Sequence, residues 1–146
     1  MHARQQIREA VVTALSGNVS ATVIDSRIWT LQTEELPLIG VYTASESDSL
    51  DEGGASMGSP VLYRELELVA EIAVIGATGQ ISANALDALA EQVEQEMPRE
   101  PAGALDVLPG SWEVEQSADG EQIISRAVMT FICQYRTAVG AAGVLL

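Results

Sequence analysis

The sequence has no lysine, and its seven arginines face 21 acidic residues, so the 146-residue chain carries a net charge of −14. Proteins that bind nucleic acid through its phosphates need a basic surface, because cationic side chains release the counterions that drive that affinity. We therefore do not expect sequence-specific recognition of DNA or RNA. A chain of this charge repels polyanions and attracts metal ions or basic partner surfaces.

Cysteine and histidine each occur once, as Cys133 and His2. A single cysteine cannot form an internal disulfide, and the chain lacks the ligand set of a structural zinc site. Acyl-transfer catalysis needs a nucleophile beside a base that titrates near neutrality, and His2 stands at the very start of the chain. Cys133 shares one face of a predicted strand with Phe131 and Tyr135, and in that position a thiol behaves as a small core hydrophobe. We therefore expect no enzymatic activity and no cofactor.

Long apolar runs are also absent. No 18 consecutive residues are all apolar, and the chain starts with a charged amphipathic segment rather than an apolar signal core. We expect a soluble protein with no membrane association. Because 47% of the residues are apolar, the chain can bury one continuous core. We predict one domain over residues 1–137 and a flexible apolar tail over residues 138–146.

The remaining candidate sites have simple structural interpretations. The glycine-rich residues 53–58 lack the lysine of a phosphate-binding P-loop, and residues 76–79 read as a turn before a helix. Glu91 and Glu94 are expected to be ordinary surface carboxylates of an amphipathic helix. The two tryptophans, at positions 29 and 112, are expected to lie in the core rather than at an interface.

Hydrophobic spacing predicts two helices and five strands. Apolar residues recur at intervals of three and four over 3–15 and 83–97, with Ser82 as the second N-cap. Residue types or strict alternation predict strands over 21–31, 36–42 and 62–75, and over 112–116 and 121–137 around an Asp-Gly hairpin turn. Residues 43–60 and 98–110 show no periodicity and are expected to be irregular.

The order of these elements is α-β-β-β-α-β-β. It predicts an α+β fold in which two helices pack on one mostly antiparallel sheet. Strands of about 15 residues exceed the usual five or six. This excess indicates a sheet that extends between subunits.

Several stretches together resemble the tail terminator, or minor tail protein U, family of long-tailed phages. They are residues 6–11 (QIREAV), Arg27, residues 35–43 (ELPLIGVYT), residues 63–68 (YRELEL) and residues 127–137, which end in QYRT. The resemblance covers most of the chain and lies in the order and spacing of these stretches.

The resemblance implies a hexameric ring on the last ring of the tail tube. Such a ring would stop tube polymerisation and offer its other face to the head-side neck proteins, and the protein would be found in the virion. Six copies at −14 each would place about 84 negative charges around a channel that DNA crosses. A repulsive wall of that kind lets DNA slide without binding. The same charge opposes ring closure, so we expect salt, divalent cations or the tube to assist assembly.

We expect the subunit interface to pair acidic and basic residues of neighbouring copies. The acidic partners are Glu46, Asp48, Asp51 and Glu52, and the basic partners are Arg27, Arg64 and Arg126. Asp48, Asp51 and Glu52 also offer oxygens to a divalent cation, although the spacing of an EF-hand is absent.

Two alternative functions remain open. One is another head-to-tail joining or tail completion protein of the neck, with a similar ring. The other is a cytoplasmic small-molecule binding domain, which would need convergent polar groups in an apolar pocket between helices and sheet.

Overall fold

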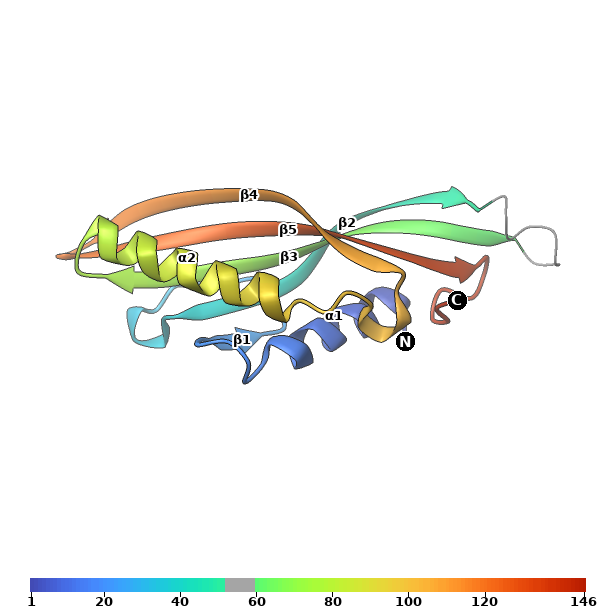
Figure 1. The fold of residues 1–146 in the computed structure, drawn as a ribbon, viewed down its shortest axis with the longest axis horizontal. Helices are drawn as coiled ribbons and strands as arrows, with labels where there is room; N and C mark the ends of the chain where they lie inside the picture. Colours follow the sequence, from blue (N-terminus) through green and yellow to red (C-terminus); the bar gives the residue numbers. More distant parts are fainter. Residues whose placement is uncertain (52–59) are drawn as a thin grey trace.

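The computed structural model describes residues 1–51 and 60–146 and consists of one helical layer on one sheet (Figure 1). The helices are α1 (Ala3–Leu15) and α2 (Gly79–Glu96), and short 3-10 turns lie at Thr33–Glu35 and Pro101–Gly103. The strands are β1 (Thr22–Ile24), β2 (Leu38–Leu50), β3 (Val61–Gly76), β4 (Asp106–Asp119) and β5 (Gln122–Ala138). The sheet order is β1-β2-β3-β5-β4, with only β1 and β2 parallel. The predicted α+β class and element order are confirmed.

Both helices pack on one face of the sheet, because each presents an apolar stripe to it. On α1 the stripe is Ile7, Val11 and Leu15, and on α2 it includes Leu86 and Val93; all are buried. The strands meet these helices with alternate residues. The sheet side of this core includes Leu66, Leu68, Ala70, Ile72 and Val74 of β3 and Met129, Phe131 and Cys133 of β5.

Strand β2 is longer than the sequence predicted. It continues through residues 43–50, which we expected to be irregular, and pairs with β3 across a bulge between Thr43 and Glu46. The pattern was missed because most of residues 43–50 are exposed and polar, so the strand is held by its backbone pairing with β3. Glu46 and Asp48 therefore lie on a strand, and Glu52 lies outside the described residues.

The strand predicted over residues 21–31 is wrong beyond Ile24. After β1 the chain crosses to the second face of the sheet, where Ile28 packs with Leu38 and Ala73. Trp29 follows with 81% of its surface exposed, and Trp112 is 42% exposed. The prediction that both tryptophans lie in the core is therefore wrong.

Helix α2 and strand β4 both begin earlier than predicted. Thr78 rather than Ser82 caps α2, because its Oγ1 accepts a hydrogen bond of 3.2 Å from the Ile81 N–H. Ser82 is buried and donates to Ser125 Oγ at 2.6 Å. β4 begins inside the stretch expected to be irregular, and its hairpin with β5 turns at residues 120 and 121, where Gly120 has a φ of +63°.

The last eight residues turn back onto their own chain rather than extending beyond the domain. The Leu146 N–H donates to the Arg136 carbonyl at 3.0 Å, and Gln6 Nε2 donates to the Gly143 carbonyl at 2.7 Å. Leu145 packs against the main core. The segment that we expected to be a flexible tail thus lies against α1 and β5 in the structure.

Candidate assembly surface

Five of the predicted interface residues form ion pairs within the same chain. Glu46, Asp48 and Arg64 form one cluster, Asp51 pairs with Arg136, and Arg126 pairs with Glu71. Arg27 stacks on aromatic rings, as described below. The structure therefore joins acidic and basic residues that we expected to meet between subunits, and their role at an interface stays a prediction.

The cluster around Arg64 lies on the helix-facing side of the sheet, where the apolar core ends. Arg64 Nη1 lies 3.1 Å from Asp48 Oδ2 and 3.3 Å from Glu46 Oε1, and its Nε donates to Thr137 Oγ1 at 2.9 Å. Glu46 is also paired with Arg4 Nε of α1 at 3.3 Å. The side chains of Arg64 and Glu46 are only 10% and 7% exposed, so the centre of the cluster is shielded from water, and the half-exposed Arg4 joins it to α1.

Tyr135 completes this cluster by donating its hydroxyl proton to Glu46. Burial, followed by this hydrogen bond to a carboxylate, raises the pKa of Tyr135 well above its usual range. The phenol therefore stays protonated and remains a donor at any physiological pH. The arrangement holds the long ends of β2, β3 and β5 together and has the character of a structural clamp.

Neither α1 nor α2 covers the second face of the sheet, because both pack against the core on the first face (Figure 1). Near its β4 border a hollow of about 260 Å³ is lined by Glu71, Glu113, Val114, Glu115, Arg126 and Val128. Arg126 is paired with Glu71, which is 5% exposed, whereas Glu113 and Glu115 are exposed. The hollow thus combines three carboxylates with one arginine and retains net negative charge.

The opposite side of the same face carries Arg27, Trp29 and Tyr42. The Arg27 Cζ lies 4.5 Å from the centroid of the Tyr42 ring and 5.8 Å from that of Trp29. Burial raises the pKa of Tyr42, and the nearby Arg27 charge acts in the opposite direction. Among the described residues Arg27 is the one arginine without a carboxylate partner. Sequence reasoning identified Arg27 but assigned Trp29 to the core, because nothing in its local pattern marks the end of β1.

Two borders of the sheet are open to strand addition in the described part of the chain. β1 pairs only with Leu38–Gly40, so β2 from residue 41 onward has no strand on its outer side. On the other border β4 is exposed over nearly all of its length, including Leu108 at 42% and Val114 at 48%. Pro109 and the bulge between Pro109 and Ser111 interrupt the β4 edge, and on either side of them the strand presents unpaired backbone groups to another chain.

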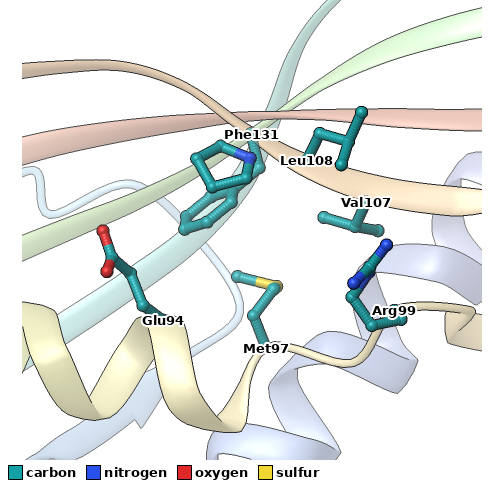
Figure 2. A pocket seen from close by; sticks show the side chains of 7 residues that line it. Glu94, Met97, Arg99, Val107, Leu108 and Phe131 are labelled. Carbon is teal, nitrogen blue, oxygen red and sulfur yellow. The ribbon is translucent and has the colours of Figure 1, made fainter.

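A small pocket of about 290 Å³ lies between the end of α2 and strands β4 and β5 (Figure 2). Met97, Val107, Leu108 and Phe131 give it an apolar lining, and Glu94 and Arg99 flank it. Arg99 Nε and Nη2 bind the Asp106 carboxylate at 2.7 and 3.0 Å, so its guanidinium is already engaged. Few polar groups converge on this pocket.

The groups with possible chemical roles lie apart from one another. Cys133 is buried, and burial raises its pKa to about 12, which keeps the thiol protonated. His2 Nδ1 accepts from the Arg4 N–H at 3.1 Å and so caps α1, and burial lowers its pKa. In residues 1–51 and 60–146 no three His, Cys, Asp or Glu side chains gather into a possible metal site. None of the described helices is long and apolar enough to cross a bilayer.

No protein-family model and no curated protein matches the chain. Among solved structures, the chain is similar to one from the virion of a native gene transfer agent particle, with a TM-score of 0.48 and 10% sequence identity. The similarity covers 93% of this chain and 96% of that one. At this level it identifies neither a family nor a function.

Proposed function

We propose that the chain is a structural protein of a phage-like virion that forms a ring, with six copies as the expected number. The ring would cap the tail tube, stop its polymerisation and join the tail to the head-side neck. Its partners would be further copies of itself, the tube protein and a neck protein. It acts without catalysis or a resident cofactor, and divalent cations assist its assembly.

The observation that carries this proposal is the pair of open borders on opposite sides of one long sheet. Strands β2, β3, β5 and β4 alternate in direction, so β2 of a second copy would lie antiparallel to β4 of the first. Contact between two different surfaces of the same chain is heterologous, and it closes into a ring when the rotation between copies permits. The sequence resemblance to tail terminators and the charge of −14 support the same function.

The charge suits a channel for DNA. A ring of this chain would surround its lumen with negative charge, and DNA would meet repulsion rather than binding sites. Another joining or completion protein of the neck would share this property, and its position in the virion would differ. A small-molecule binding domain is less well supported, because few polar groups converge on the pocket at the end of α2.

The test is the oligomeric state of the purified chain, measured by light scattering with negative-stain imaging at moderate salt with magnesium. Closed rings are the expected result. Leu108→Lys on the exposed β4 border should abolish them, because lysine on an edge strand opposes strand addition. Ile81→Lys serves as the control, since Ile81 is 54% exposed at the start of α2 and the charge change is the same.

The control variant should form rings like those of the unchanged chain. A compact monomer under every condition would contradict self-assembly and favour the binding-domain alternative. Rings that persist in Leu108→Lys would leave self-assembly intact but remove the β4 border from its mechanism.

A further inference from the structure

We propose that Arg27 and Trp29 of one copy dock on the acidic hollow beside β4 of the next copy, with Glu113 as a main contact. This inference rests on the proposed self-assembly and names the residues through which neighbouring copies recognise each other. It replaces the pairing expected from the sequence, in which Glu46, Asp48, Asp51 and Glu52 were the acidic partners.

Arg27 is the arginine whose charge remains available to a second copy. Six of the seven arginines have carboxylate partners among the described residues, and Arg27 does not. Its guanidinium lies over Tyr42 and near Trp29, so stacking fixes its position while its charge stays unneutralised. Trp29, 81% exposed, is a large side chain of the type that anchors interfaces.

The receiving surface is hollowed and negatively charged. The hollow of about 260 Å³ has an apolar group from Val128 and carboxylates from Glu113 and Glu115 on the same face of the sheet. The one arginine there, Arg126, is already held by Glu71. An entering guanidinium would find unpaired carboxylates, and a flat aromatic ring would find apolar surface.

Strand register places the two surfaces at nearly the same level of the sheet. Ile24 of β1 and Gly40 of β2 align with Glu71 of β3, Val128 of β5 and Glu113 of β4, so one row crosses the sheet from the β1 border to the β4 border. Tyr42, under Arg27, lies two residues along β2 on the same face. Arg27 and Glu113 therefore lie at nearly the same level on opposite sides of the sheet. A copy placed beside the first along this row would bring them together.

The geometry fits a second copy of this chain because both halves of the contact occur on every chain. A single surface of each kind per copy gives the head-to-tail contact that a ring requires. The interface combines charge complementarity with a small apolar patch. The charge complementarity determines the choice of partner and the register of the contact more than the affinity.

The experiment exchanges the two charges in separate chains. Arg27→Glu and Glu113→Arg should each weaken self-association about a hundredfold or more, because each brings like charges together. An equimolar mixture of the two should assemble again, since copies alternating around an even-numbered ring satisfy every contact. Light scattering and imaging follow assembly, and circular dichroism with urea unfolding confirms that each exposed-site variant is folded.

The matched control is Glu96→Arg on α2, which changes an exposed carboxylate in the same way. It should assemble alone and should not rescue Arg27→Glu. Rings formed by Arg27→Glu alone would overturn the inference, as would a failed mixture of two variants that are each defective. Absence of rings from the unchanged chain would instead count against the proposed function itself.

Discussion

Arg64 carries its charge into a region almost closed to solvent, where Glu46, Asp48 and Thr137 surround its guanidinium. A buried ion pair contributes little compared with a well-packed apolar pair, yet removing one partner leaves the other charge with less compensation. Glu46 keeps its contacts with Arg4 and Tyr135, so Arg64→Met should lower the free energy of unfolding by about 2 kcal/mol, less than the ~3–5 kcal/mol of a fully uncompensated buried charge. Urea unfolding measures the change.

The comparison for Arg64 is Arg99→Met, which breaks the exposed pair with Asp106. Exposed pairs are screened by water and salt, so this variant should unfold at nearly the same urea concentration as the unchanged chain. Equal losses in the two variants would show that burial of the Arg64 cluster has no energetic consequence.

The sequence identified the charged residues of the candidate site but not the groups that pair with them. It identified Arg27, Arg64 and Arg126 as available cations. Two of them are in fact held by Glu46, Asp48 and Glu71, because strand register places those carboxylates beside them. Register depends on the whole sheet, and no local pattern specifies it.

Strand β2 and the segment after β1 depend on a close approach at Gly40. A Cβ added there would lie 2.5 Å from the Ser26 carbonyl oxygen and 3.1 Å from Ile28 Cγ1. Gly40→Ala should displace the segment that carries Arg27 and lower the free energy of unfolding by about 1–3 kcal/mol, the usual cost of overpacking.

The control for Gly40 is Gly79→Ala in the first turn of α2, where the added Cβ would lie 3.6 Å from Gln116 Oε1, an ordinary contact. Alanine favours the helix, so this variant should match or slightly exceed the stability of the unchanged chain. Urea unfolding compares the two. Stability retained in Gly40→Ala would show that the segment shifts without cost.

Elements with strong hydrophobic patterns were predicted well, and those with polar sequences were not. β3 alternates over residues 64–68 and is apolar at nearly every position over residues 68–75, so its existence followed from the sequence. The outer half of β2 is polar on both faces, and its ladder with β3 and the contacts of Glu46 and Asp48 with Arg64 hold it in place. The cap of α2 was misplaced because Ser82 and Thr78 are both good caps, and tertiary packing buries Ser82 against Ser125.

Net charge governs whether whole molecules can meet. For two copies of charge −14 with centres roughly 30 Å apart, Coulomb's law in water gives a repulsion of about 27 kcal/mol. Screening lowers this to about 10 kcal/mol at 0.01 M salt and to about 1 kcal/mol at 0.1 M. An exposed ion pair contributes at most about 1 kcal/mol, so repulsion outweighs the Arg27 contact at low salt.

Assembly should therefore increase as sodium chloride rises from about 0.01 to 0.1 M, and magnesium should act at lower concentration. The double variant Glu91→Gln with Glu96→Gln, both exposed on α2, removes two negative charges and should shift the salt midpoint of assembly downward. Asn84→Asp, exposed on the same helix, should shift it upward. Light scattering across the salt series gives each midpoint. Assembly that weakened steadily from the lowest salt would mean that local attraction, and not the net charge of −14, controls the encounter of two copies.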